Sequence, residues 1–144
     1  MVRARRGGPG ARRVLSMVGL VVATHGRLAE ELLRTAGGIV GPLEQCEAVS
    51  VGAGASMEEA RAHLGEAVKR VDRGDGVLVL TDIYGATPGN IALKLLEAGR
   101  VEGIAGVNLP MLMRALTYRE RGMEILLTRA IAGGRDGVLN MQDH

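Results

Sequence analysis

The sequence of 144 residues has a single cysteine and almost no aromatic side chains. Cys46 has no partner for an internal disulfide, and one thiol does not make a cysteine-based zinc site. Tyr84 and Tyr118 are the only aromatic residues, so the stacking surface that binds single-stranded nucleic acid is missing. No apolar run reaches the roughly 18 residues needed to cross a bilayer. We therefore expect a cytoplasmic protein without nucleic-acid partners and without direct membrane insertion.

The motifs of common cofactor sites are also missing. The sequence has no Gly-Lys-Ser/Thr of the kind that ends a nucleotide-binding P-loop. Residues 52–54 resemble the opening of a dinucleotide loop, but Met57 stands where its third glycine belongs. The three histidines, His25, His63 and His144, lack the spacing of metal ligands. We expect no metal, no bound cofactor and no direct use of ATP.

Positive charge is concentrated at the N-terminus. Residues 1–16 carry five arginines and no acidic residue, whereas residues 17–144 carry 13 basic and 16 acidic residues. Five charges are weak evidence for a nucleic-acid-binding arm. We expect residues 1–16 to be a disordered basic extension that folding does not require, and residues 17–144 to form one domain.

Short apolar runs alternate with helical patterns along this domain. The runs are rich in β-branched residues, which is typical of strands covered on both faces. This alternation favours an α/β fold, a doubly wound and mainly parallel sheet with helices on both faces. The strand-like runs are residues 18–23, 46–51, 77–80 and 104–107, and residues 136–140 are a possible C-terminal antiparallel edge strand.

Helix boundaries follow from capping residues. A cluster of helix-ending residues stops the first helix: Gly37, Gly38, Gly41 and Pro42. Ser56, with a glutamate three positions later, is the N-cap of the second helix. Thr87 is an N-cap candidate and Pro88 a good first helical residue, so a third helix is predicted from there to about residue 98.

Two titratable side chains follow neighbouring strands of the predicted sheet. His25 follows the first strand, and Asp82 ends the third. In open α/β sheets, ligands bind beyond the carboxyl ends of the strands where the strand order changes, here between the first and third strands. A carboxylate beside an imidazole accepts a hydrogen bond from one ring nitrogen and leaves the other as a nucleophile or base. From these residues alone, a loop histidine and a strand-end carboxylate without joint function are equally compatible.

The surroundings of this pair suit a phosphoryl group. Gly26 lets the backbone approach closely, and the helix that follows it offers backbone N–H groups to an anion. The helix at Pro88 directs a second positive dipole end to the same crevice. The hydroxyl groups of Thr24 and Thr87 are further donors.

Three segments resemble motifs of the mannose-family IIA domains of the bacterial phosphoenolpyruvate-dependent sugar phosphotransferase system. They are residues 17–33, 81–90 and 106–112, with Thr-His-Gly at positions 24–26 and Gly-Ala-Thr-Pro at positions 85–88. The resemblance extends over residues 17–144, in the same order and at similar separations. Three motifs together are specific, whereas Thr-His-Gly alone is not.

This resemblance implies a phosphotransferase with a phosphohistidine intermediate. His25 would accept a phosphoryl group from the carrier protein HPr and pass it to a separate IIB protein, with Asp82 orienting the ring. The phosphate-binding candidates are Thr24, Gly26, Gly85, Ala86 and Thr87. The family is typically homodimeric through exchange of a C-terminal strand, for which residues 136–140 are the candidates.

Two other functions remain open at this stage. In the first, the protein is a regulatory switch: phosphorylation of His25 controls the binding of a protein partner, without sugar transport. The second is a small-molecule-binding domain of flavodoxin-like architecture, for which no convincing phosphate loop is present. For the docking of a donor protein, small or apolar side chains around His25 are expected to form the rim, with Leu28, Ile83, Tyr84 and Leu109 as candidates.

Overall fold

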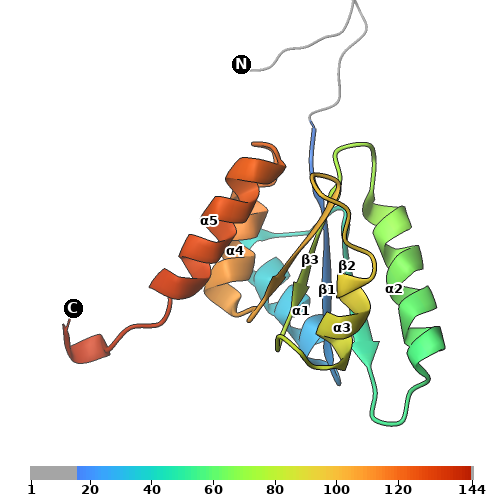
Figure 1. Cartoon of the computed structure of the whole chain (residues 1–144). Coiled ribbons are helices and arrows are strands. Elements are labelled where there is room, and N and C mark those ends of the chain that lie inside the picture. Colours follow the sequence, from blue (N-terminus) through green and yellow to red (C-terminus); the bar gives the residue numbers. More distant parts are fainter. Residues whose placement is uncertain (1–15, 144) are drawn as a thin grey trace, which may run out of the picture.

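The computed structural model describes residues 16–143, in which helices and strands alternate (Figure 1). The elements in chain order are β1 (Gly19–His25), α1 (Leu28–Val40), β2 (Cys46–Val51), α2 (Met57–Val71), β3 (Val77–Thr81), α3 (Thr87–Leu93), β4 (Val101–Ala105), α4 (Leu109–Tyr118), α5 (Met123–Asp136) and the short 3-10 helix η1 (Met141–Asp143). Apart from Ser16, the predicted N-terminal extension lies outside the described residues, so its disorder stays a prediction.

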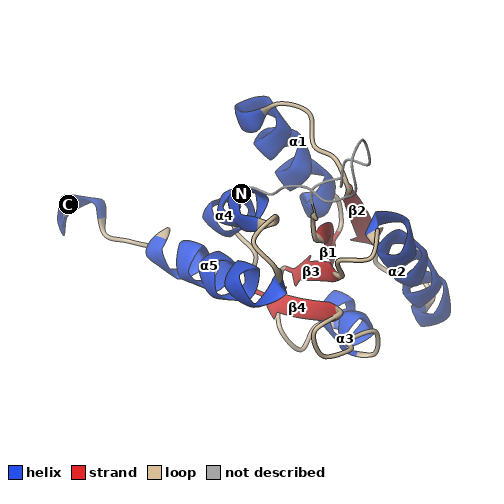
Figure 2. Cartoon of the chain, turned by 90° about the horizontal axis from the view of Figure 1, so that it is seen from above, coloured by secondary structure: helices blue, strands red, loops and turns tan. Residues whose placement is uncertain are grey.

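The four strands form one parallel sheet in the order β2-β1-β3-β4. β1 pairs with β2 on one side and with β3 on the other, so the strand order changes between β1 and β3. Seen from above, α2 and α3 cover one face of the sheet, and α1, α4 and α5 cover the other (Figure 2). The predicted doubly wound α/β fold is confirmed. Among the described residues, no helix combines the length and apolarity needed to span a membrane.

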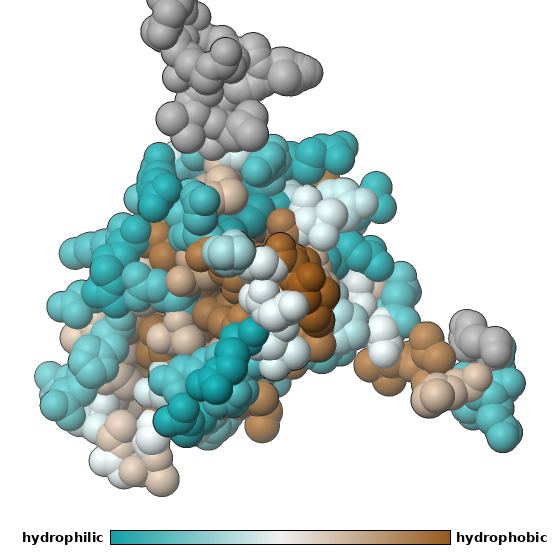
Figure 3. Space-filling model, turned by 180° about the vertical axis from the view of Figure 1, so that it is seen from behind, coloured by the Kyte–Doolittle hydropathy of each residue, from teal (hydrophilic) through white to brown (hydrophobic). Residues whose placement is uncertain are grey.

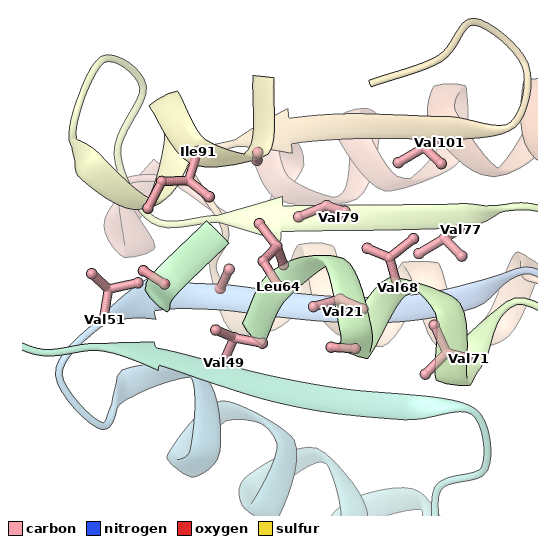
Figure 4. Close-up of a cluster of buried hydrophobic side chains, with 14 residues drawn as sticks. Val21, Val49, Val51, Leu64, Val68, Val71, Val77, Val79, Ile91 and Val101 are labelled. Atoms are coloured by element: carbon pink, nitrogen blue, oxygen red, sulfur yellow. The ribbon is translucent and has the colours of Figure 1, made fainter. Parts of the chain in front are cut away.

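One hydrophobic core lies between the sheet and the helices α2 and α3 (Figure 4). Val21, Val77 and Val79 point from the sheet into this core, where Leu64 of α2 packs against them. All four side chains are at most 1% exposed. Ser56 caps α2 as predicted, because its hydroxyl accepts a hydrogen bond of 3.3 Å from the Glu59 amide.

The second core lies on the opposite face of the sheet. The alternate residues of the same strands, Leu20, Leu78 and Leu80, contact Leu112 of α4 and Leu126 of α5. None of these five side chains is exposed to solvent. Burial on both faces explains why β1 and β3 read as continuous apolar runs in the sequence.

One predicted helix end is confirmed only in part, and another is wrong. Helix α1 continues through Gly37 and Gly38 to Val40 and ends at Gly41, whose amide donates to the Gly37 carbonyl at 2.8 Å. A glycine inside a helix costs about 1 kcal/mol relative to alanine, and packing of the buried face of α1 against the sheet outweighs that cost. Helix α3 ends at Leu93, before the predicted residue 98, because the chain turns there to begin β4.

The start of the fourth strand is also earlier than predicted. β4 covers Val101–Ala105, and Val101 lies opposite Val77 in the sheet. Edge pairing with β3 sets this start, whereas the apolar pattern alone placed it at residue 104. Tertiary pairing therefore overrode the local hydrophobic signal at this edge.

The predicted C-terminal edge strand is absent from the described chain. Asp136 is the last residue of α5, and residues 137–140 lead away from the body of the domain without strand pairing (Figure 1). Val138 and Met141 are 76% and 84% exposed, and the C-terminal segment carries apolar side chains at the surface (Figure 3). Residues 137–140 pair with no strand of the described chain, so strand exchange between two copies stays a prediction.

Candidate functional site

The candidate site lies at the carboxyl ends of β1 and β3. His25 is the last residue of β1, and Asp82 directly follows β3. These strands pair with each other in parallel, with Ala23 opposite Thr81. The two polar side chains therefore emerge side by side at the change of strand order, where open α/β sheets bind ligands.

The predicted contact between the two side chains is present. The Nδ1 atom of His25 lies 2.8 Å from Oδ2 of Asp82, and the backbone amide of His25 donates to the same oxygen at 3.1 Å. The other carboxylate oxygen accepts a hydrogen bond of 3.1 Å from the amide of Ile83. The His25 side chain is 50% exposed, against 11% for Asp82. This geometry fixes the imidazole through Nδ1 and leaves Nε2 as the ring nitrogen without a protein partner among the described residues.

The surroundings of Asp82 favour its ionised form. Partial burial raises the pKa of the carboxyl group, but hydrogen bonds from the His25 ring and from backbone amides lower it by more. The result is a pKa below the ordinary value of 3.8. Asp82 is therefore a carboxylate at neutral pH, and it accepts a hydrogen bond from the protonated Nδ1 of His25.

The lowered pKa predicts a loss of stability in acid that depends on Asp82. A carboxyl group whose pKa is lower in the folded than in the unfolded state stabilises the protein fully above the unfolded value. That contribution is lost as the pH falls below about 3.8 and through the folded value. Urea unfolding between about pH 6 and about pH 3 should therefore show a steeper loss for the wild type than for Asp82→Asn. Parallel curves for the two proteins would contradict this role of the carboxylate.

The prediction that the Thr24 hydroxyl is a free donor beside His25 is wrong. The side chain is completely buried, and its Oγ1 accepts a hydrogen bond of 2.7 Å from the Ala29 amide. The same hydroxyl donates to the His25 carbonyl at 3.1 Å. Thr24 therefore joins the start of α1 to the backbone of His25, and its hydroxyl is not free to meet a phosphate.

The chain between β1 and α1 is a tight turn at Gly26. Its φ of +54° is in the left-handed region, and its amide donates to the Val51 carbonyl at 3.2 Å. Arg27 is the N-cap residue of α1, but its side chain makes no capping hydrogen bond. Its Nη2 atom lies 3.4 Å from Oε1 of Glu30. The first turn of α1 carries two acidic side chains, Glu30 and Glu31. One of its backbone amides, that of Ala29, already donates to the Thr24 hydroxyl. The helix offers fewer amides to an anion than predicted.

The segment after Asp82 forms the other wall of the site. Gly85 has a φ of +84°, and its carbonyl accepts a hydrogen bond of 3.2 Å from Nδ2 of Asn90. Sequence reasoning did not single out Asn90, although it ends the motif at residues 81–90. Ala86 is the N-cap of α3 and Thr87 is its first residue, so the prediction of Thr87 as the N-cap is wrong.

Replacing Thr87 by alanine should therefore leave stability nearly unchanged. The Thr87 side chain is exposed, and no side chain caps α3. Loss of a true threonine cap costs about 1 kcal/mol, whereas an exposed non-capping substitution changes the unfolding free energy by less than about 0.5 kcal/mol. Chemical denaturation of Thr87→Ala tests this, with Ser56→Ala as the matched variant that removes a real cap. Equal losses for the two would restore the capping role.

Apolar side chains close to His25 and Asp82 in the sequence lie at the protein surface. Leu28, Ile83 and Tyr84 are 45%, 56% and 76% exposed. Leu109 is the exception among the four predicted rim residues, because it is half-buried against the second core. Three of the four thus offer apolar surface to solvent.

The remaining candidates from the sequence lie elsewhere. His63 is exposed on α2, and residues 52–54 form the turn before that helix. Cys46 begins β2, and burial raises the pKa of its thiol, although nearby Arg119 offsets part of this effect. Among residues 16–143, no group of three or more histidine, cysteine or acidic side chains is placed to hold a metal ion.

One buried arginine has a structural role that the sequence did not indicate. Arg119, directly after α4, is only 5% exposed and donates hydrogen bonds to the carbonyl oxygens of Val18, Glu44 and Gln45. It ties the start of β1 to the loop before β2, at the end of the sheet opposite His25. Nothing in the local sequence distinguishes this arginine from its exposed neighbours.

Comparison with known proteins agrees with this geometry. A family model described as "PTS system fructose IIA component" matches residues 19–128. The mannose-specific EIIAB component of the phosphotransferase system of Escherichia coli K12 is 33% identical over 124 residues, which cover 84% of this chain and 38% of that protein. The fructose-specific EIIA component of Bacillus subtilis is 32% identical over 105 residues, 72% of each chain. The chain thus spans well under half the length of the EIIAB relatives.

Solved structures show the same fold. The phosphotransferase system component EIIA from Streptococcus agalactiae superposes with a TM-score of 0.80 at 26% identity, covering 89% of this chain and all of that one. The mannose/sorbose-specific IIA subunit from Enterococcus faecalis gives a TM-score of 0.78 at 29% identity, covering 86% and 94% of the two chains. With a family model matching most of its length, the chain belongs to the mannose-type IIA family of the phosphotransferase system.

Proposed function

We propose that this protein is a phosphocarrier that accepts a phosphoryl group on Nε2 of His25. The observation that carries this proposal is the 2.8 Å contact between Nδ1 of His25 and the Asp82 carboxylate. It holds the proton on Nδ1, so the lone pair of Nε2 points outward from a half-exposed ring. An outward imidazole lone pair is a nucleophile at neutral pH.

The proposed transfer is balanced without an added cofactor. Nε2 of His25 attacks the phosphorus of a phosphohistidine on the donor, the donor's N–P bond breaks, and the electron pair returns to the donor's ring. Asp82 keeps its negative charge and stabilises the positive charge that develops on the His25 ring. Reversal of the same step on an acceptor side chain restores free His25. By family membership, HPr is the proposed donor and a IIB protein the proposed acceptor.

The phosphate is proposed to lie between the two walls of the crevice. Gly26 gives close backbone access on one side, while Gly85, Ala86 and the hydroxyl of Thr87 line the other. None of these four residues is charged, and Gly26 and Gly85 place no Cβ beside the site. Thr24 acts behind them by fixing the His25 carbonyl and the first turn of α1.

Docking of a protein donor is proposed to use the apolar rim. Leu28, Ile83 and Tyr84 expose apolar area next to a half-exposed His25. Contact between proteins through such a rim removes water from the reacting groups. We further propose a homodimer, supported by the unpaired apolar segment Val138–Met141 and by β4 as the last strand of the sheet.

Phosphoryl loading is the direct test of the proposed function. Incubation with phosphoenolpyruvate, Enzyme I and HPr should add one phosphoryl group to the intact protein, measured by mass spectrometry. The modification should be lost in acid and kept in base, as expected for a phosphoramidate. Absence of uptake, or uptake that survives acid, would reject a histidine phosphocarrier.

Replacing Asp82 by asparagine should slow loading strongly without unfolding the protein. The amide keeps the shape of the side chain but carries no charge, so it neither fixes the Nδ1 proton nor stabilises a cationic ring. Loss of such a carboxylate costs up to about 10⁴-fold in a related imidazole mechanism, and we expect at least about 100-fold here. Rapid-quench measurement of loading, with circular dichroism to check folding, tests this, and Asp136→Asn on the exposed end of α5 is the control. A rate within about twofold of wild type would remove Asp82 from the mechanism.

A further inference from the structure

A small pocket lies between helix α3 and strand β4, and its lining includes Thr81, the residue before Asp82. Its volume is about 70 Å³, and it opens beside Tyr84. The pocket exists because the facing surfaces are built from small residues, with Gly89 and Ala92 on the helix and Gly103 and Ala105 on the strand. Side chains this small leave a gap between the helix and the strand.

The floor of the pocket carries a buried hydroxyl without a partner. Thr81 is 3% exposed and lines the pocket, and its Oγ1 lies 3.6 Å from the position that a Cβ on Gly89 would take. Its carbonyl accepts hydrogen bonds from Gly106 and Val107, but within residues 16–143 the side chain makes no hydrogen bond. A buried hydroxyl that lacks a partner is unfavourable, so this group is available to a ligand.

The remaining wall restricts the chemistry of that ligand. Leu93 and Leu96 of the helix side supply apolar surface, and no charged side chain lines the pocket. An ionic molecule would lose its hydration without gaining a counter-charge. One water occupies about 30 Å³ in the liquid, so the pocket holds at least two water-sized groups and suits a molecule of only a few heavy atoms.

We propose that this pocket binds small neutral alcohols and carbonyl compounds of about three carbon atoms, with their oxygen on the Thr81 hydroxyl. Such a molecule matches the pocket in size, fills its apolar walls and supplies the missing hydrogen-bond partner. Ligands this small bind weakly, with dissociation constants in about the millimolar range. The proposal concerns binding alone and does not depend on the phosphoryl chemistry of His25.

Acetone, 2-propanol and acetate form a matched set of probes, because acetate has the shape of acetone and carries a charge. In two-dimensional NMR titrations of the ¹⁵N-labelled protein, acetone and 2-propanol should give saturable shifts at Gly89, Ala92 and residues 103–105, and acetate should not. The His25 amide should also respond, because it donates to the carboxylate that directly follows Thr81. Shifts that rise linearly and are spread over the protein would overturn the proposal and leave only water as an occupant.

Two variants separate the pocket from general solvent effects. Thr81→Val keeps the shape and removes the hydroxyl, so binding of both neutral probes should weaken at least about fivefold. This variant should fold, because removing an unpartnered buried hydroxyl does not reduce stability. Ala105→Val fills the pocket and should abolish saturable binding. Unchanged titrations in both variants would place the probes elsewhere and reject the site.

Discussion

Replacing His25 by alanine should abolish phosphoryl uptake from HPr completely. No other side chain among the described residues combines a free imidazole nitrogen, a fixed tautomer and exposure at the carboxyl end of the sheet. The carboxylate of Asp82 would remain, but it has no role as an acceptor without the ring. The fold should be retained, because the His25 side chain is half exposed and its backbone bonds do not depend on the ring.

His63 provides the matched control for this experiment. It is an exposed histidine on α2 whose side chain makes no hydrogen bond within the described residues. His63→Ala should load at the wild-type rate, whereas His25→Ala should show no added mass after prolonged incubation. Uptake by His25→Ala at a stoichiometry near that of the wild type would place the phosphoryl group on another residue and end the proposal.

Replacing Arg119 by methionine should cause the largest loss of stability of any substitution considered for this protein. Its guanidinium group donates to the carbonyl oxygens of Val18, Glu44 and Gln45 at 3.0, 2.7 and 2.7 Å. Methionine keeps most of the apolar stem but removes the guanidinium donor from all three carbonyls. The Gln45 carbonyl keeps the Leu20 amide at 2.9 Å and the Glu44 carbonyl keeps the Cys46 thiol at 3.3 Å, whereas the Val18 carbonyl loses its side-chain partner. Each buried polar group without a partner costs about 1–3 kcal/mol, and water entering from the adjacent surface pocket will relieve part of this cost. We expect a net loss of about 3 kcal/mol.

Chemical denaturation with Arg121→Met as the control tests this role. Arg121 is an exposed arginine two positions later, whose guanidinium carbon lies 5.9 Å from the centre of the Tyr118 ring. Loss of that contact should cost at most about 1 kcal/mol. Similar unfolding free energies for the two variants would show that the hydrogen bonds of Arg119 contribute nothing beyond those of a surface arginine. Phosphoryl loading of the folded Arg119→Met fraction should be unaffected, because Arg119 lies at the opposite end of the sheet.

The local sequence determined the parts of this protein that depend on near neighbours. Continuous runs of β-branched residues gave the strands, because a strand buried on both faces needs apolar side chains at every position. The alternation of strands with amphipathic helices gave the doubly wound sheet, and the rule that ligands bind at the change of strand order brought His25 and Asp82 together. Their contact could be predicted because His25 ends β1 and Asp82 directly follows β3, with no loop between either side chain and its strand.

Only the tertiary structure decided what depends on distant partners. Thr24 and Thr87 looked alike as hydroxyl donors, but Thr24 is buried against α1 while Thr87 is exposed and caps nothing. Arg119 was not among the candidates from the sequence, because its partners lie 74 to 101 residues away in the chain. Whether a polar side chain is buried, and whether its hydrogen bonds are satisfied, is a property of the packed surfaces around it. No local pattern encodes those surfaces, so the roles of these side chains and the free hydroxyl of Thr81 emerged only when the sheet and its helices were assembled.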